Sequence, residues 1–324
     1  HKLSHRLNIH ELPFFGRKQE LSQLEEYLSL VETGEAVGPF LVIGQSGTGK
    51  KRLLRQLVLM SNRSFNFIKV EGKATSQRYE GSAWNDLRQA LEKLGDEMGI
   101  SLLEEEDDLI SVWNQLQSLS KEKPLLILLE NAQWIDAVSL EKVKQLEERR
   151  NQEKWQLIFT AEEPLPDFFV NFLGSLKVEK RLSQLELTNF DPSESRALLK
   201  GELGAIEPAV MEQMVEWSEG SPFLLSSYIE EWKENENLEP LPDIIQAYLS
   251  QELGDMSSEE EALLHYLSCF HKPISLSILA ELTATELPVL TELIETLSER
   301  AIVSIVEEGE ALMVQFCKQL VAMY

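Results

Sequence analysis

The sequence predicts an α/β fold, a parallel sheet with helices on both faces, followed by a mainly helical C-terminal part. Short apolar runs of strand type recur at 39–43, 65–70, 125–129 and 155–160. Long helical stretches separate these runs, and strands that alternate with helices form parallel sheets covered on both sides. The length of 324 residues is also too great for one small core, so two or three domains are expected.

The first elements follow from hydrophobic spacing and from glycine. Residues 19–33 carry leucine and tyrosine at helical spacing, which predicts an amphipathic helix that ends at glycines. Residues 39–43 form a continuous apolar run, typical of a strand buried on both faces, and Gly44 begins a turn. Helical spacing resumes at 50–60, so the chain opens with a helix, a strand, a glycine-rich loop and a second helix.

The pattern changes near residue 186, where strand-like runs give way to short helices. The expected helices lie near 193–203, 208–218, 222–232, 244–253, 258–268, 275–282 and 286–300. Two strands, at 302–306 and 311–316, flank a Glu-Glu-Gly-Glu turn. Helices followed by a two-stranded hairpin predict a winged-helix domain at the end of the chain.

Most of the net charge of −25 lies in the C-terminal half. Residues 186–240 hold 13 acidic and 3 basic residues, and residues 241–324 hold 14 and 3. Nucleic acids are bound mainly through Lys and Arg that neutralise phosphates, so an acidic surface repels them. We therefore expect no nucleic acid among the partners of this segment.

The lengths of the apolar runs and the number of cysteines indicate in which compartment the protein is expected. The longest apolar runs fall far short of the roughly 20 residues that cross a bilayer, and no signal peptide is evident, so we expect no membrane partner. Cys269 and Cys317, the only cysteines, have apolar neighbours; we expect both in the core of a cytoplasmic protein. His1 at the start, and an end at Tyr324 in mid-pattern, suggest a piece of a longer chain whose other domains are expected partners.

A phosphate-binding loop motif directly follows the first predicted strand and directly precedes a helix. Its seven residues are Gly44, Gln45, Ser46, Gly47, Thr48, Gly49 and Lys50. The glycines let the backbone wrap so that amide groups and the helix N-terminus face an anion, and Lys50 would reach the β- and γ-phosphates. The motif in this context predicts a P-loop NTPase sheet.

Two positions depart from the motifs of hydrolysing proteins. Lys51 stands where the loop carries Ser or Thr to place a hydroxyl on Mg²⁺, and an ammonium group cannot coordinate a cation. The strand at 125–129 runs into Glu130 and Asn131, where hydrolysing proteins usually have two acids. Asn131 cannot act as a general base. Glu130 is either a Mg²⁺ ligand or an acid that ends a buried strand, so no catalytic residue is assigned and Mg²⁺ is expected to bind weakly or not at all.

Four segments in this order resemble the signal-transduction ATPases with numerous domains (the STAND class, related to AAA+ ATPases). They are Phe15-Gly16-Arg17-Lys18-Gln19-Glu20-Leu21, the loop at 44–50, Gln133-Trp134-Ile135-Asp136 with Val138-Ser139-Leu140, and Gly220-Ser221-Pro222-Phe223. The match is nearest to ATPase modules that precede tetratricopeptide repeats in bacterial transcriptional regulators and cyclases. The resemblance implies a nucleotide-binding domain at 1–185, a helical lid at 186–240 and a winged helix at 241–324.

The resemblance also implies roles for individual residues. Gly16 and Arg17 correspond to the motif that lies against adenine, and Pro222 to the lid proline that touches the base, so ATP or ADP is the expected ligand. Glu162 stands where relatives carry an arginine that senses the γ-phosphate. With Lys51, Glu130 and Asn131, this is the fourth departure from the hydrolytic pattern.

Two hypotheses remain from the sequence. In the first, the chain is a regulatory switch that binds ATP or ADP with impaired or absent hydrolysis. In the second, it is a pseudo-ATPase scaffold that binds no nucleotide and acts through protein contacts. A third reading, a DNA-binding replication initiator, is disfavoured because the helix at 286–300 carries four glutamates against Arg300 alone.

Overall fold

The computed structural model describes residues 12–35, 37–75, 77–100, 108–150, 153–178, 182–238, 241–254, 256–270, 272–300, 302–308, 311–317 and 321. The chain divides into two compact units, the first ending at Thr188 and the second beginning at Asn189. The described residues include no helix of the length and apolarity needed to cross a membrane.

The first unit is built on a five-stranded parallel sheet with the strand order β2-β3-β4-β1-β5. The strands are β1 (Phe40–Ile43), β2 (Asn66–Glu71), β3 (Leu125–Glu130), β4 (Trp155–Ala161) and β5 (Ser183–Glu186). The three central strands are buried along their whole length, as a parallel sheet covered on both faces requires. The sequence predicted the four apolar strands and the parallel sheet, and both are confirmed.

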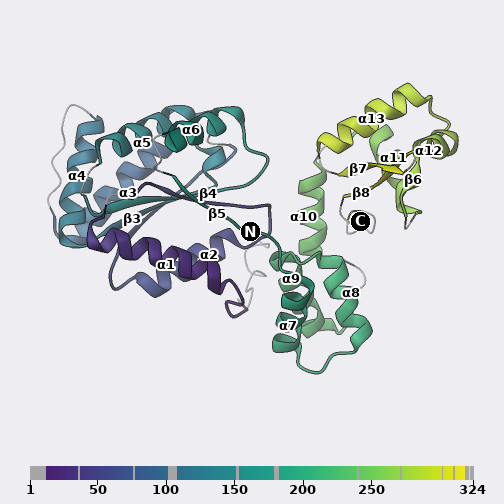
Figure 1. Ribbon diagram of the computed structural model, residues 1–324, viewed down its shortest axis with the longest axis horizontal. Coiled ribbons are helices and arrows are strands. Elements are labelled where there is room, and N and C mark those ends of the chain that lie inside the picture. The colour runs from purple at the N-terminus through teal and green to yellow at the C-terminus, as the bar shows by residue number, and fades with distance from the viewer. Residues whose placement is uncertain are drawn as a thin grey trace, which may run out of the picture. The chain divides into compact units, whose positions relative to one another are not determined.

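Alternate residues of the strands face two separate hydrophobic cores. Leu41 and Ile43 of β1 belong to one core with the third to sixth helices, and Phe40 and Val42 belong to the other with the first two. These helices lie on opposite sides of the sheet in Figure 1. They are α1 (Lys18–Thr33), α2 (Lys50–Ser61), α3 (Ser82–Met98), α4 (Asp108–Glu122), α5 (Ala137–Arg149) and α6 (Asp167–Val178). A short 3-10 helix, η1 (Ala132–Trp134), follows β3.

The second unit consists of helices and one small sheet. The helices are α7 (Pro192–Leu203), α8 (Pro208–Ser218), α9 (Pro222–Asn235), α10 (Asp243–Leu253), α11 (Ser258–Ser268), α12 (Leu276–Thr283) and α13 (Leu287–Glu299). The antiparallel sheet has the order β6-β8-β7, with β6 (Ile274–Ser275), β7 (Val303–Glu308) and β8 (Ala311–Phe316). Local sequence sets several helix starts: Asp191 and Ser257 each form a capping box with the glutamate three residues later.

Three expectations differ from the structure. The edge strand β5 escaped prediction because Leu185 is its one buried residue, and the two-residue β6 is too short to give a pattern. Cys269 and Cys317 are exposed, not core residues. Cys269 follows the last turn of α11 and Cys317 follows β8, so each lies past the end of an element whose apolar residues suggested burial.

Candidate functional site

The loop between β1 and α2 has the backbone that the glycines predict. Gly47 and Gly49 have φ angles of 78° and 95°, in the left-handed region that favours glycine. Gly44 is required for a different reason, because a Cβ atom there would lie 2.4 Å from the carbonyl oxygen of Leu187. The chain that follows β5 therefore presses against the start of the loop, and Leu187 N–H donates to Ile43 O at 2.7 Å.

Lys50 is folded into this loop. Its side chain is 7% exposed, and Nζ donates to the carbonyl oxygens of Gly44 at 2.8 Å and Gln45 at 2.7 Å. Burial lowers the pKa of Lys50; Glu162 nearby opposes the shift and Lys51 adds to it. The ammonium group thus lies within the loop and donates to two neutral carbonyl groups. Hydrogen bonds between an ammonium group and an anion are stronger than these, so an anionic ligand would replace them.

The rest of the loop is held by Thr48 and leaves amides available. Thr48 Oγ1 donates to Gln45 O at 2.9 Å, and the side chain is buried. Within the part of the chain that the structure describes, the amides of Ser46, Gly47 and Gly49 have no acceptor. A loop with free amides at the start of a helix can receive phosphate oxygens.

Arg17 joins the N-terminal motif to the loop. Gly16 and Arg17 both have left-handed φ angles, 64° and 58°, just before α1. The buried guanidinium donates to Thr48 O at 3.3 Å and to Thr188 O at 2.5 Å, and pairs with Glu20 at 3.0 Å. Arg17 therefore lies beside the loop at 44–50, and its expected role toward adenine stays a prediction.

The carboxyl ends of β2 and β3 form the edge where a metal ion would be held. Glu71 and Glu130 are register partners in these strands. Lys51 forms an ion pair with Glu71, and Asn131 Nδ2 donates to the same carboxylate oxygen at 3.4 Å. Glu130 is 4% exposed and pairs with Lys69 at 2.8 Å. Each carboxylate at this edge is thus already neutralised by a lysine.

These residues do not fit a Mg²⁺ ion. Mg²⁺ in nucleotide sites takes oxygen ligands, yet Lys51 offers an ammonium group and Asn131 offers its amide nitrogen to Glu71. Among the described residues, no group of three or more His, Cys, Asp or Glu side chains could hold a metal ion. Glu71 was missed by sequence reasoning, because an acid at the end of an edge strand has no motif of its own.

Asn131 is fixed by backbone geometry. Its φ is 51°, a left-handed conformation that Asn adopts more readily than most residues, and its N–H donates to Thr160 Oγ1 at 3.0 Å. A Cβ atom at Gly72 would lie 2.4 Å from the carbonyl oxygen of Asn131. The turn after β3 and the turn after β2 are therefore packed directly together.

Glu162 follows β4 on the same edge of the sheet. Its N–H donates to Gln133 Oε1 at 3.2 Å, and its charge acts on Lys50. Position 162 thus carries a negative charge that acts on Lys50, the opposite of the arginine that the resemblance led us to compare it with.

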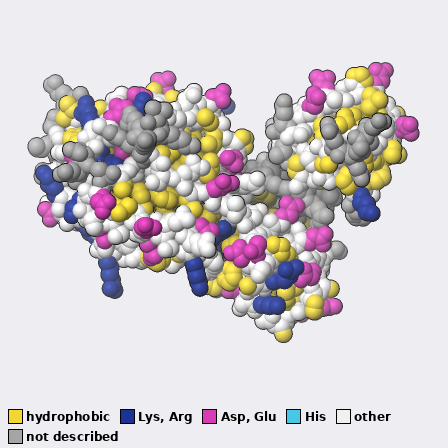
Figure 2. All heavy atoms as spheres, in the orientation of Figure 1, with side chains coloured by type: hydrophobic (Ala, Val, Ile, Leu, Met, Phe, Trp, Pro, Cys, Tyr) yellow, Lys and Arg dark blue, Asp and Glu magenta, His cyan; other side chains and the backbone are white. Residues whose placement is uncertain are grey.

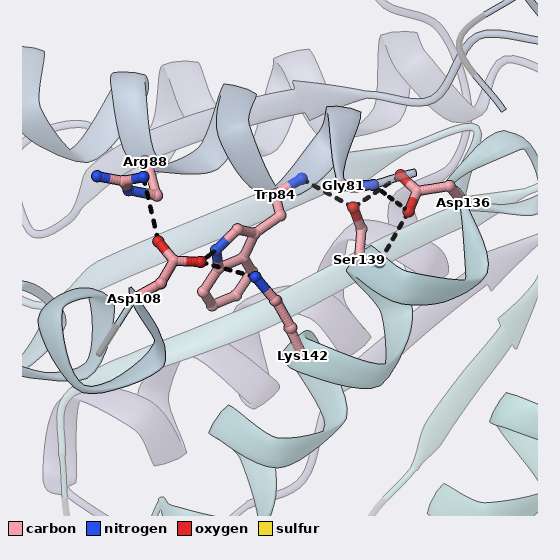
Figure 3. A network of polar contacts seen from close by, with 7 residues as sticks. All are labelled: Gly81, Trp84, Arg88, Asp108, Asp136, Ser139 and Lys142. Carbon is pink, nitrogen blue, oxygen red and sulfur yellow. Dashed lines mark hydrogen bonds and ion pairs between the residues drawn. The ribbon is translucent and has the colours of Figure 1, made fainter. Parts of the chain in front are cut away.

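Asp136 and Ser139, which belong to one of the four resembling segments, form a structural clamp (Figure 3). Asp136 caps α5 by accepting from Ser139 N–H at 2.9 Å, and it also accepts from Gly81 N–H at 2.8 Å at the start of α3. Ser139 Oγ donates to Asp136 at 2.7 Å and accepts from Trp84 N–H at 2.9 Å. Burial opposes ionisation, but the hydrogen bonds from Ser139, Gly81 and Ala83 hold the pKa of Asp136 below its usual range.

Asp108 forms a second part of this network at the start of α4. Its carboxylate pairs with Lys142 at 2.7 Å and Arg88 at 3.1 Å, and it accepts from the indole of Trp84. Figure 3 shows these side chains converging from α3, α4 and α5. They join the helices that cover one face of the sheet, so we assign them to stability and not to ligand binding.

Pro222 lies in the second unit, at the first turn of α9. Ser221 caps this helix, and a Cβ atom at Gly220 would lie 2.0 Å from the carbonyl oxygen of Phe190. The Gly-Ser-Pro sequence is thus explained by local packing and helix capping. A role for Pro222 toward a base stays a prediction.

Part of the chain is similar to a known family. Residues 13–159 match the family model of the AAA ATPase domain. No curated protein matches the sequence. The matched residues include the Gly16-Arg17 motif, the loop, Glu130 and Asn131, and the match ends within β4.

Solved structures share the fold at low sequence identity. The ORC2 protein of Aeropyrum pernix, in ADPNP-ADP complexes, has 15% identity and a TM-score of 0.61, over 97% of this chain and 96% of that chain. The Aeropyrum pernix ORC1 protein in complex with DNA has 16% identity and a TM-score of 0.50, over 96% and 91%. A STAND protein with a tetratricopeptide repeat sensor from Pyrococcus horikoshii has 19% identity and a TM-score of 0.43, over 95% and 42%. The five-stranded parallel sheet with its helices is like that of AAA+ ATPases, whereas the winged helix and the STAND class stay predictions.

Proposed function

We propose that this AAA+-type P-loop chain is a regulatory module that binds ATP or ADP, hydrolyses ATP slowly or not at all, and uses nucleotide to change its conformation. The observation that carries the proposal is the loop between β1 and α2. It has glycines with left-handed φ angles, amides without acceptors among the described residues, and a lysine folded into it. These are the groups that bind a polyphosphate in phosphate-binding loops.

Impaired hydrolysis is inferred from the side chains around the loop. In-line attack on a γ-phosphate needs a positioned water and a metal ion that offsets the developing charge. Here Asn131 is an amide that donates to Glu71, Lys51 stands at the metal position of the motif, and the charge of Glu162 acts on Lys50. The amide of Asn131 and the ammonium group of Lys51 cannot accept a proton from water, and an ammonium group cannot be a ligand of Mg²⁺.

The division of the chain supports regulation by movement. The described structure consists of two compact units, and the resemblance to STAND proteins suggests that the second contains a lid at 186–240 and a winged helix at 241–324. We infer that nucleotide biases the relation between the units, as in switches that close around a ligand.

A DNA-binding role is not favoured, although one solved structure with this fold is described in complex with DNA. The exposed surface of α13 carries Leu287, Val289, Glu292 and Glu295. Arg300, just after the helix, is paired with Glu260 at 3.4 Å. Figure 2 shows apolar side chains beside acidic ones on this part of the chain, a surface suited to protein and not to phosphate.

Calorimetric titration with ATP, ADP and GTP, with a phosphate-release assay on the same samples, tests the proposal. We expect micromolar binding of an adenine nucleotide, a loss of at least about 100-fold in Lys50→Ala, and negligible phosphate release. Lys93→Ala, on the exposed surface of α3, is the matched control and should bind normally. Absence of heat with every nucleotide would favour the scaffold hypothesis.

A further inference from the structure

Three lysines surround the edge formed by the ends of β2 and β3. Lys51 pairs with Glu71, and Lys69 pairs with Glu130. Lys73 also acts on Glu71, whose pKa is lowered by the hydrogen bond from Lys51 and by the charges of Lys51, Lys69 and Lys73. At the ends of β2 and β3, three ammonium groups stand against two carboxylates, and the charge of Glu162 after β4 acts on Lys50, so an excess of positive charge remains.

Of these three lysines, Lys51 lies nearest to the phosphate loop in the sequence, as the second residue of α2. Lys51 extends from there to the end of β2, where Asn131 also contacts Glu71. A divalent cation would meet an ammonium group at this point, whereas an anionic phosphate chain would be attracted to it.

We propose that the ammonium group of Lys51, held at the strand edge by Glu71, replaces the divalent cation beside a bound polyphosphate, so that the chain prefers metal-free nucleotide to its Mg²⁺ complex. The proposal rests on the proposed function. It assigns Lys51 as the counter-charge of the phosphates and Glu71 as the group that holds Lys51 in place. Glu130 has Lys69 as its partner in this arrangement.

The pair can be altered without unfolding the chain. The side chains of Lys51 and Glu71 are 53% and 33% exposed, and exposed ion pairs contribute little to stability. Variants at both positions should therefore report on binding and not on folding. The exposed Lys93–Glu97 pair of α3 offers a matched control.

Titration of ADP in EDTA and in excess Mg²⁺ tests the proposal. The wild-type chain should bind ADP at least about tenfold more tightly in EDTA, because the Mg²⁺ complex carries less negative charge and its metal meets Lys51. Lys51→Thr should reverse this order: binding in EDTA should fall about tenfold or more, and Mg²⁺ should restore it through the freed carboxylate of Glu71.

A second variant isolates Glu71. In Lys51→Thr/Glu71→Gln, the uncompensated carboxylate is gone, so binding in EDTA should recover in part and Mg²⁺ should no longer help. Lys93→Thr and Lys93→Thr/Glu97→Gln should match the wild-type chain in both buffers.

The outcomes distinguish nucleotide binding by the chain from the role of Lys51 as a replacement for the metal ion. If the wild-type chain binds no nucleotide in either buffer, the proposed function fails. If it binds ADP tightly only with Mg²⁺, nucleotide binding stands but Lys51 does not replace the metal. The same conclusion follows if Lys51→Thr keeps the wild-type preference for EDTA.

Discussion

The phosphate loop and the neighbouring strand edge differ in what holds them. The loop at 44–50 depends on backbone geometry: Gly44 has no space for a side chain, and Gly47 and Gly49 have left-handed φ angles. The edge formed by Glu71 and Glu130 depends on side-chain charge, and lysines neutralise both carboxylates. The shape of the loop can thus persist while the charges at the strand edge change, because the two depend on different physical features.

The largest effect on stability and nucleotide binding is expected for a substitution in the loop, at Gly44. In Gly44→Ala the new Cβ atom would lie 2.4 Å from Leu187 O, so the loop and the chain after β5 must separate. We expect a loss of about 1–3 kcal/mol in the free energy of unfolding and no measurable nucleotide binding. Urea unfolding and calorimetry provide the measurements.

Gly174→Ala is the control for that substitution. Gly174 lies inside α6 with no heavy atom within 4 Å of an added Cβ, so alanine should leave the stability unchanged or raise it by up to about 1 kcal/mol. Normal nucleotide binding by Gly44→Ala would show that the close approach to Leu187 does not shape the loop.

The next largest effect is expected for a substitution of Asp136. It should lower stability without changing the loop or the strand edge. Asp136→Ala leaves the buried N–H groups of Gly81 and Ser139 without their acceptor. We expect a loss of about 2 kcal/mol in the free energy of unfolding, with little change in nucleotide affinity. A large drop in affinity at unchanged stability would place Asp136 in the binding site after all.

The clamp also predicts a pH dependence. The pKa of Asp136 in the folded chain is below its unfolded value of about 3.9, so its contribution is fully present above that pH. The contribution is lost as the pH falls through the lower folded pKa. Unfolding measured between pH 7 and pH 2.5 should show a shallower acid loss in Asp136→Asn than in the wild-type chain; identical slopes would contradict the assignment.

A smaller effect is expected at the strand edge. Lys69→Met removes the partner of Glu130, a carboxylate that is 4% exposed. Because the lysine itself is half exposed, we expect a loss of about 1 kcal/mol in the free energy of unfolding at pH 7. The exposed control Lys93→Met should cost less.

The smallest effect on stability is expected for Lys51→Thr, within about 0.5 kcal/mol, because its ion pair is exposed. Thermal unfolding without nucleotide measures it. A cost above about 2 kcal/mol would mean that the strand edge is held as firmly as the loop, and the contrast between the two would disappear.

The sequence predicted the parts of the fold that depend on continuous patterns. Apolar runs identified β1 to β4, and helical spacing identified the helices on either side of the loop. The strand β5 could not be identified this way, because an edge strand with one buried residue has no apolar run.

The site was predictable where a motif fixes position, and not where distant segments meet. The loop and the altered residues Lys51 and Asn131 follow from single positions in the sequence. Lys51 and Glu71 are 20 residues apart in the sequence, and no local pattern links them. Their ion pair depends on the strand order, which places β2 beside β3 in the sheet. Likewise, Asp136 looked like part of a nucleotide motif until its contacts with Gly81 and Ser139 identified it as a helix cap.

The contacts at the end of the first unit have a mechanical consequence. Leu187 lies against Gly44, and Thr188 O accepts from Arg17, which also holds Thr48 O. The chain leaves the first unit through these two residues. A displacement of Gly44 or Thr48 would therefore disturb the contacts that hold Leu187 and Thr188, the last two residues of the first unit.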